Sequence, residues 1–449
     1  MSARVVRRSL AVGLPLALLG TVCVAGTATG AQDRHHRPDG APKVTSTAVL
    51  ADIPLAGFSN GLLPGTVGDD RGVMLGGIGS DIYPAGRTGE YWTVTDRGPN
   101  GQIKVDGTKR RTFPVPGFDP AIVKVRVSGG RVRVLEAVPL TTRSGAPVTG
   151  LSNQEGRDEA PYSYDAGTPL AYNPNGLDTE GIVRVADGSF WLVDEYGPSL
   201  VHVSGRGRVL ARYVPRGLNL MGADYPVVEA LPGVLLHRKT NRGFEGLALL
   251  PGGDLVLAVQ SPLSLPDQDA GEASRNVRLL RFSPGKRAVT AEYAYRFDAV
   301  DVVDPGEDDT SELKISSVVA IGRDELLVEE RTDRAARLHR VTLPHGRGIL
   351  GSRWDTPAAS PSYEELTDPA AAGVPVLRKS LVVDLGRVAG VPGKIEGVAV
   401  TGRDTLALVN DNDFGMTDGS GAFDADGRLV DSGIETSVTL LKLPRPLTH

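Results

Sequence analysis

One short phrase occurs three times in this chain and constrains its fold more than any other feature. A glutamate followed by a glycine opens an apolar, strand-like run at residues 179–183, 244–248 and 395–399. A second apolar run follows each copy after a glycine-containing turn, and its first polar residue comes 14, 15 and 14 residues after the glutamate. Repetition of this kind in strand-rich sequence favours a propeller or a solenoid over a single sandwich.

Two less regular copies, at residues 79–83 and 315–319, extend the series and replace the leading Glu-Gly with Ser80-Asp81 and Ser316-Ser317. The repeat starts are roughly 65 to 100 residues apart, longer than a compact propeller repeat, so loops must be inserted between strands. We predict an all-β fold, a β-propeller with five clear repeats and room for a sixth blade. It forms a single domain over residues 45–449.

The rest of the composition agrees with strands and turns. The 56 glycines and 32 prolines punctuate short apolar runs, and no long helical periodicity appears after residue 35. We expect residues 44–58 to close the ring by pairing with residues 437–443, because this pairing removes the free edge. A Gly-x-Ser-x-Gly match at residues 57–61 lacks the strand–helix context of a nucleophile elbow, and we predict a turn there.

The N-terminus predicts export. Residues 1–31 form a signal peptide with a basic start, an apolar stretch and small residues before Gln32, and residues 32–44 form a disordered lead-in. Both the Sec and the twin-arginine route fit. Cleavage removes the single cysteine, Cys23, and three arginines but no acid, which takes the formal charge from −5 to −8. We therefore expect a secreted monomer without a nucleic-acid or membrane partner.

In a propeller, the first strand of each blade lies beside the central channel, so the repeated glutamates should meet at its mouth. Clustered carboxylates repel one another unless a cation or protons neutralise them, and Ca²⁺ accepts six to eight oxygen ligands. We predict a calcium site formed by Glu180, Glu245, Glu396 and Asp413. The alternative is that the glutamates only bond the backbone of neighbouring blades. Zinc is disfavoured, because the histidines show no paired spacing.

Basic residues also lie at the repeat starts and second-strand ends. Arg97, Arg331 and Lys394 are candidates for binding an anionic ester substrate, although pairing between blades explains such charges almost as well. Asp96, Asp194 and Asp411 follow second strands and are candidates for orienting the attacking water. A serine hydrolase is weakened by the lack of a recognisable Ser-His arrangement in the sequence.

At these residues the chain resembles a known family. The segments at residues 91–100, 179–181, 191–198, 244–246 and 395–397, taken in this order, are similar to the family called "esterase-like activity of phytase". The resemblance covers roughly residues 70 to 442. It implies a β-propeller, secretion and a phosphoesterase role supported by calcium.

The prediction is a secreted, calcium-dependent hydrolase of phosphate or related esters that acts on a small anionic substrate at the channel mouth. The alternative is a non-catalytic extracellular ligand-binding propeller with a structural metal ion, whose ligand lies against Trp92, Tyr196 and Tyr164.

Overall fold

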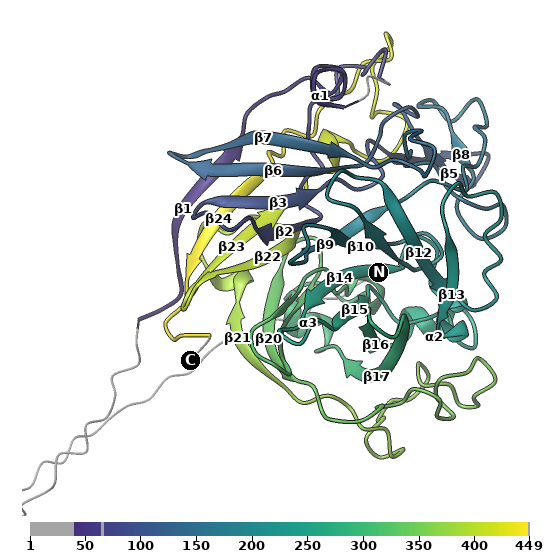
Figure 1. Cartoon of the computed structure of the whole chain (residues 1–449), viewed down its shortest axis with the longest axis vertical. Coiled ribbons are helices and arrows are strands. Elements are labelled where there is room, and N and C mark those ends of the chain that lie inside the picture. Colours follow the sequence, from purple (N-terminus) through teal and green to yellow (C-terminus); the bar gives the residue numbers. More distant parts are fainter. Residues whose placement is uncertain (1–39, 64–66, 448–449) are drawn as a thin grey trace, which may run out of the picture. The chain divides into compact units, whose positions relative to one another are not determined.

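Strands form most of the regular structure, and most of them fall into five groups that follow the sequence repeats (Figure 1). The computed structural model describes residues 40–63 and 67–447, so the predicted signal peptide and most of the lead-in lie outside the described residues. Residues Gly40–His449 belong to one compact unit. Its first strand begins at Lys43, two residues before the predicted start of the domain.

Each group is an antiparallel series of four strands, extended in the second by a parallel fifth strand. The first group contains β2 (Asp81–Pro84), β3 (Glu90–Val94), β6 (Ala121–Ser128) and β7 (Arg131–Pro139). The second contains β9 (Thr179–Arg184), β10 (Phe190–Asp194), β11 (Ser199–Val203), β12 (Val209–Pro215) and β13 (Val227–Leu231). The third contains β14 (Phe244–Leu249), β15 (Leu255–Val259), β16 (Asn276–Ser283) and β17 (Ala288–Arg296).

The last two groups complete the series. The fourth contains β18 (Val318–Ala320), β19 (Glu325–Arg331), β20 (Ala336–Thr342) and β21 (Lys379–Asp384). The fifth contains β22 (Ile395–Gly402), β23 (Thr405–Asn410), β24 (Ser437–Lys442) and β1 (Lys43–Leu50). A three-stranded sheet stands apart and contains β4 (Gly101–Val105), β5 (Thr108–Thr112) and β8 (Pro161–Tyr162).

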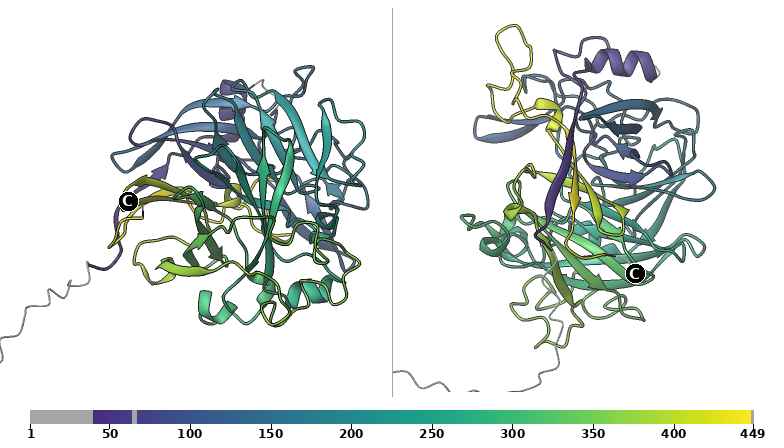
Figure 2. Two further views of the ribbon diagram at one scale, coloured as in Figure 1. Left: turned by 60° about the horizontal axis from the view of Figure 1, so that its bottom comes forward. Right: turned by 90° about the vertical axis from the view of Figure 1, so that its left-hand side faces the viewer.

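The first strands of the five groups make the fold a β-propeller. β2, β9, β14, β18 and β22 contact one another in this order, and β22 contacts β2 again. The predicted closure is confirmed, because β1 pairs antiparallel with β24, with Val44 opposite Leu441 and Ala48 opposite Val438 (Figure 2). β1 also pairs in parallel with β7, which joins the last group to the first.

The glycine of the repeated Glu-Gly pair is explained by the close approach of neighbouring first strands. A Cβ atom on Gly181 would lie 2.9 Å from the Glu245 carbonyl oxygen, and one on Gly397 would lie 2.8 Å from Cα of Asp81. Real Cβ atoms do not come this close to backbone atoms. The two irregular copies carry a polar side chain at the position of this glycine. The Asp81 side chain accepts from the Ile182 amide of the next first strand, and the Ser317 side chain accepts from the Val398 amide.

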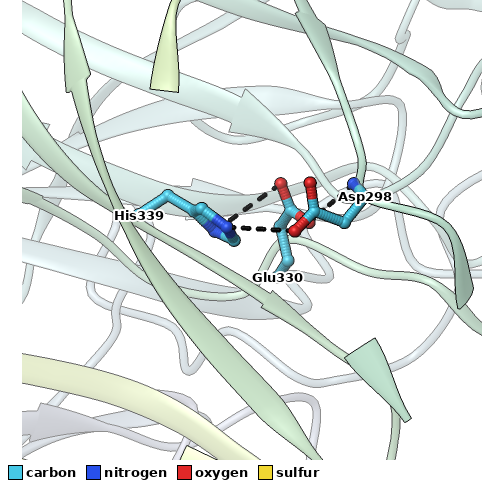
Figure 3. A group of neighbouring side chains, drawn as sticks. All are labelled: Asp298, Glu330 and His339. Carbon is cyan, nitrogen blue, oxygen red and sulfur yellow. Dashed lines mark hydrogen bonds and ion pairs between the residues drawn. The ribbon is translucent and has the colours of Figure 1, made fainter. Parts of the chain in front are cut away.

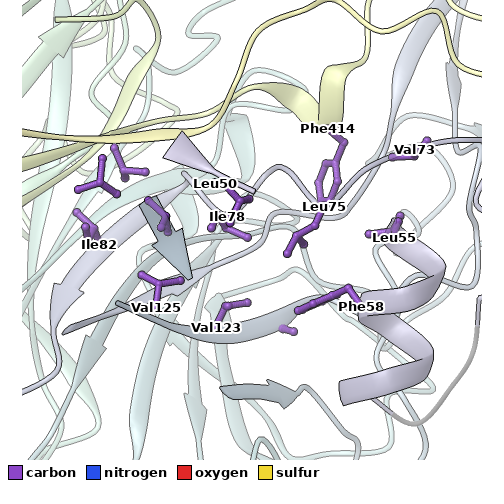
Figure 4. Packing of buried hydrophobic residues seen from close by; sticks show 14 of the residues in the cluster. Leu50, Leu55, Phe58, Val73, Leu75, Ile78, Ile82, Val123, Val125 and Phe414 are labelled. Carbon is purple, nitrogen blue, oxygen red and sulfur yellow. The ribbon is translucent and has the colours of Figure 1, made fainter. Parts of the chain in front are cut away.

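In the part of the chain that the structure describes, helices are few and short. The α-helices are α1 (Leu55–Leu62), α2 (Gln268–Ala273) and α3 (Val300–Val303), and the 3-10 helices are η1 (Gly233–His237), η2 (Thr310–Glu312), η3 (Leu385–Arg387) and η4 (Asp413–Gly415). None of the helices in the described ranges is long and apolar enough to cross a bilayer. The turn predicted at residues 57–61 is wrong, because α1 covers it and buries Leu55 and Phe58 in the core beside Phe414 (Figure 4).

Candidate functional site

A cavity of about 540 Å³ opens where the first strands begin and the second strands end. Every group of strands contributes to its lining. The ionisable side chains are nine acids and six bases: Asp96, Glu180, Glu195, Glu245, Asp333, Glu396, Asp411, Asp413 and Asp418, with Arg97, Arg111, Arg242, Lys314, Arg331 and Lys394. The cavity therefore combines both signs of charge in a largely buried setting.

The three repeated glutamates meet in this cavity. One carboxylate oxygen of each of Glu180, Glu245 and Glu396 lies within 4.8 Å of the others. All three side chains are buried because they stand at the starts of β9, β14 and β22, the strands that line the axis. Their convergence is confirmed, and their role as metal ligands stays a prediction.

Two of these glutamates already have cationic or polar partners. Glu245 accepts from Gln260 Nε2 at 2.6 Å and from the Ser316 hydroxyl at 3.1 Å, and Arg331 Nη2 lies 3.6 Å from it. Glu396 forms an ion pair with Arg331 and lies 3.7 Å from Lys394 Nζ. Part of the charge that an ion would neutralise here is therefore neutralised by the protein.

Glu180 also belongs to a second group of carboxylates, in which Asp178 is paired with Arg97. Asp178, Glu180 and Glu195 also place one oxygen each within 4.8 Å of the others. Glu195 Oε1 is buried without a hydrogen-bond partner, and Glu180 makes no hydrogen bond or ion pair within the described ranges. Burial, followed by repulsion from Glu245 and Asp178, raises the pKa of both Glu180 and Glu195 well above the usual range. A cation bound here would remove this repulsion.

Other oxygen atoms around the cavity are also buried and unpartnered, namely Gln260 Oε1 and Asp411 Oδ1. Buried acceptors without a donor are costly, and in native structures they point to an unseen partner such as an ion or water. Carboxylate and amide oxygens are hard ligands of the kind that Ca²⁺ prefers. The residues present therefore fit a calcium ion, centred on Glu180.

The predicted catalytic aspartates do not share one location. Asp96 and Asp411 line the cavity, and burial followed by repulsion from Asp411 raises the pKa of Asp96 well above its usual range. Asp194 does not line the cavity, which corrects its assignment. It is fully buried, its Oδ2 lies 2.6 Å from Nη2 of Arg212, and its Oδ1 accepts from the Asp178 amide at 2.7 Å. Asp194 thus holds the segment that carries Asp178 and Glu180.

All three bases predicted to bind substrate line the cavity, but each is paired with an acid. Arg97 Nε lies 3.2 Å from Asp178 Oδ2. Arg331 bonds Glu396 and also lies 3.0 Å from Asp333, while Lys394 bonds Asp411 at 2.9 Å and also bonds Asp413. Their charges mainly hold the carboxylates in place.

Asp413, the fourth predicted metal ligand, lies at the rim in a tightly anchored segment. Asp413 and Phe414 both have positive φ, 50° and 55°. The Phe414 ring packs edge-on against Phe118 and fills the space beside Gly77, where a Cβ would lie 2.0 Å from the ring. Phe414 thereby fixes the segment that presents Asp411 and Asp413, and Lys394 bonds both carboxylates.

Several site residues have no counterpart in the sequence-based prediction. Asp178 precedes the repeat glutamate by two residues, and Asp333 follows Arg331 by two. Asn241 accepts from Arg97 and comes from the loop before β14. Asp178 could have been recognised in the sequence, because it is an acidic residue directly before the Thr179-Glu180 pair. Nothing in the repeat pattern marks Asn241.

A third carboxylate group lies outside this cavity (Figure 3). Asp298 Oδ2 lies 3.2 Å from Nε2 of His339, and Glu330 lies next to it. Lys379 forms ion pairs with both acids, and the Tyr295 hydroxyl donates to Glu330 at 2.5 Å. Protein cations already neutralise this group, so we assign it a structural role.

The structure does contain one Ser-His contact, contrary to the expectation from sequence. Ser189 Oγ lies 3.0 Å from His202 Nε2 in a different cavity. The Ser189 hydroxyl also donates to Asp187 at 2.6 Å, as does the Ser189 amide at 2.8 Å, in an ordinary turn. Because the carboxylate accepts the hydroxyl proton, His202 does not act as a base toward Ser189, and the contact is not a catalytic triad.

The aromatic residues expected to form a ligand-binding face do not lie together. Trp92 packs in the core against Phe190, with a centroid separation of 5.1 Å. The buried Tyr196 hydroxyl donates to the Gly150 carbonyl, and Tyr164 lies under Arg71. These contacts do not support the proposed aromatic face.

The buried carboxyls predict an unusual pH dependence of stability without metal. Burial raises the pKa of Glu329, next to the cavity, to about 8, and the pKa values of Glu180 and Glu195 are also raised. The folded state therefore binds more protons than the unfolded state above the ordinary carboxyl range, so stability falls as pH rises. We expect the melting temperature of the metal-free protein to fall between pH 6.5 and 8, and calcium to reduce this fall. A constant or rising melting temperature would contradict the assignment.

The fold and site define a β-propeller with a mixed-charge axial cavity rich in carboxylates. A family model described as phytase-like, "Esterase-like activity of phytase", matches residues 74–414. The chain belongs to this family. An uncharacterized secreted protein of Arthroderma benhamiae is 26% identical over 328 residues, which span 63% of this chain and 64% of that relative. The match thus covers less than two thirds of the relative's length.

Solved structures with low sequence identity also align with the chain. The PQQ-bound aldose sugar dehydrogenase of Streptomyces coelicolor is 12% identical, and the alignment covers 90% of this chain and all of that one at a TM-score of 0.34. The calcium-binding protein regucalcin of Agrobacterium tumefaciens is 11% identical, with 83% and 94% covered and a TM-score of 0.34.

Proposed function

We propose that this protein is a secreted hydrolase of phosphate or related esters that depends on calcium bound in the axial cavity. The observation that carries the proposal is the convergence of Glu180 with two further carboxylate pairs, Glu245 with Glu396 and Asp178 with Glu195. Membership of the phytase-like family supports the class of reaction, and the predicted signal peptide and the secreted relative support the location. The substrate in this proposal is a small anionic ester, for which a cavity of about 540 Å³ has room, and the protein acts as a monomer.

Calcium in this site would polarise an ester oxygen and lower the pKa of water. Glu180, with Glu195 and Asp178, would hold the ion, and Glu245 and Glu396 would complete its oxygen ligands. Asp96 and Asp411 also line the cavity, near each other, and would orient the water and accept its proton. Asp194 has no part in this chemistry, since it is bonded within the protein.

The paired bases have a positioning role in this proposal. Arg331 bonds Ser316 at 2.6 Å and touches Glu245, Glu396 and Asp333, so it fixes the carboxylates of two neighbouring groups. Lys394 does the same for Asp411 and Asp413. Fixed ligand positions reduce the reorganisation needed when the ion binds.

Hydrolysis of a generic phosphomonoester and a phosphodiester, with and without a chelator, tests this function. We expect activity that is lost with chelator and restored by calcium, and that falls at least about 100-fold in Glu245→Gln because one ligand charge is removed. Glu136→Gln, on the exposed face of β7, makes the same change away from the cavity and should be neutral. Activity unchanged by chelator and by Glu245→Gln would disprove the proposal. Stabilisation by calcium without turnover on any ester would instead support a binding propeller.

A further inference from the structure

A second cavity, of about 310 Å³, lies where the first strands end, at the other end of the axis from the repeated glutamates. All five first strands line it with apolar side chains, among them Ile82, Val183, Leu247, Val318 and Val398. In the part of the chain that the structure describes, Asp81 is its one carboxylate, and no lysine, arginine or histidine lines it. Asp81 accepts from the Ile182 amide at 2.9 Å. This inner cavity is therefore apolar.

A wider outer cavity, of about 730 Å³, adjoins the inner cavity and extends over the second group of strands. The half-buried side chains of Tyr83, Leu249 and Ala320 line both cavities. Trp191 on β10 and Tyr213 on β12 line only the outer one. The path from β9 to β12 crosses three strand spacings, about 14 Å in all. The two cavities therefore form one elongated groove with an apolar inner end.

The outer cavity carries hydrogen-bond donors that lack acceptors. Trp191 and Tyr213 are each only 4% exposed, and neither the indole N–H nor the phenol hydroxyl has a hydrogen-bond partner within the described ranges. Burial raises the pKa of Tyr213, and the charge of Arg287 opposes this rise, so the hydroxyl is a protonated donor near Arg287. Buried polar groups without partners are costly and point to an unseen ligand, ion or water.

Arg287 gives this end of the groove a free positive charge. It lies on the exposed turn between β16 and β17, and among the described residues it has no ion pair or side-chain hydrogen bond. The acid of the outer cavity, Asp187, accepts from the hydroxyl and the amide of Ser189, and its charge acts on His202. Burial lowers the pKa of His202, which is therefore neutral at pH 7. The region around Tyr213 thus favours an anion.

We propose that this groove binds a free monocarboxylate with an alkyl chain, a molecule of the fatty-acid type. Its carboxylate accepts hydrogen bonds from Arg287, Tyr213 and Trp191, and its chain runs past Leu249 and Tyr83 into the inner cavity. A purely apolar molecule would leave the donors without acceptors, and a small anion would leave the apolar end unfilled. The site is separate from the carboxylate cavity and does not depend on the proposed hydrolase function.

Calorimetric titration of the full mature chain with decanoate tests the groove, in calcium-free buffer because calcium precipitates fatty acids. Extended decanoate is close to the groove in length. Hexanoate changes only the chain, while decanol and decylamine change only the head group. We expect decanoate to bind and hexanoate to bind at least about 50-fold more weakly, because each buried methylene contributes about fourfold in affinity. Decylamine should bind much more weakly than decanoate, since its positive charge would face Arg287.

Variants separate the head group from the chain. Arg287→Gln should weaken decanoate at least about 10-fold and leave decanol unchanged, because only a charge-assisted contact is lost. Tyr213→Phe should weaken decanoate about 5-fold through the loss of one hydrogen bond. Ala320→Phe fills the junction of the two cavities and should weaken decanoate more than hexanoate. Lys286→Gln is the matched control, because it removes a charge from the same exposed turn at a residue that does not line the groove.

Three results would overturn the inference: no decanoate binding at millimolar concentration, equal affinity for decanoate and decylamine, or wild-type affinity for decanoate in Arg287→Gln. Loss of decanoate binding in Lys286→Gln to the same extent as in Arg287→Gln would also contradict it, because the effect would then be one of general surface charge. The readout is binding without calcium, so each result stands whether or not the protein hydrolyses an ester.

Discussion

Glu180→Gln is expected to abolish tight calcium binding and, at the same time, to stabilise the metal-free protein. Glu180 is the one carboxylate common to the two groups described above, and its side chain has no hydrogen-bond or ion-pair partner within the described ranges. Removing its charge relieves repulsion with Glu245, Asp178 and Glu195, which together with burial raises its pKa. A unit charge about 4 Å from an ion near a protein surface is worth roughly 4 kcal/mol, so calcium affinity should fall by at least about 100-fold.

The two opposite effects make this prediction specific. Calorimetry gives the loss of calcium affinity, and thermal melting with chelator gives the gain in stability of the metal-free form. Glu136→Gln is the matched control, because it makes the same chemical change on exposed β7. If Glu180→Gln instead lowers the melting temperature of the metal-free protein, Glu180 stabilises the contact between neighbouring blades, and its role as a calcium ligand is contradicted.

Arg212→Met is expected to cause the largest loss of stability of any substitution considered. Arg212 is fully buried and donates to Asp194, Asn153 and Ser199, at 2.6, 2.8 and 2.8 Å. Its removal leaves the buried Asp194 without its cation, which typically costs about 3–5 kcal/mol. The free energy of unfolding from urea denaturation, measured in saturating calcium, should fall by this amount.

The same residues test the corrected role of Asp194. Burial already raises the pKa of Asp194 to about 6, so an unpaired Asp194 should take up a proton and recover some stability in acid. The double variant Arg212→Met with Asp194→Asn should be more stable than Arg212→Met alone, because it leaves no buried charge. Asp194→Asn should reduce the amount of folded protein while the turnover of each folded molecule stays close to wild type. A selective loss of turnover in that variant would restore a catalytic role.

The sequence was sufficient for the fold and for the convergence of the main acids. Glu180, Glu245 and Glu396 each stand at the start of an apolar strand. In a radial fold these strand starts meet at the axis, so the glutamates converge there. The pairing of β1 with β24 was also predictable, because an open ring would leave two free edges. The repeat therefore predicted the convergence of the glutamates, and the need to close the ring predicted the pairing of β1 with β24.

Pairing between side chains could not be read from the repeat. Asp194 occupies the same repeat position as Asn410, yet Arg212 from the fourth strand of its own group binds it. Whether a base such as Arg331 or Arg242 is paired depends on loops and neighbouring groups that lie far away in the sequence, such as Glu396 for Arg331. The substrate-binding role of Arg97, Arg331 and Lys394 therefore stays a prediction, although the structure pairs each of them with a carboxylate.

The conformation of short polar segments was equally hidden. Asp413 was predicted as a metal ligand from the sequence, but the geometry of its segment depends on the Phe414 ring packing against Phe118 and beside Gly77. The helix α1 was missed because Gly57 and Gly61 are typical of turns, and its apolar face became visible only against the core. Tertiary packing overrode local preference in both places.

Anomalous scattering from a calcium-soaked crystal tests the central claim most directly. We predict a peak in the axial cavity, with oxygens of Glu180 and at least one of Glu195, Asp178, Glu245 and Glu396 at calcium–ligand distances of about 2.3–2.6 Å. No peak in the cavity at saturating calcium, or a peak only at surface carboxylates such as Asp69 or Asp424, would contradict the account.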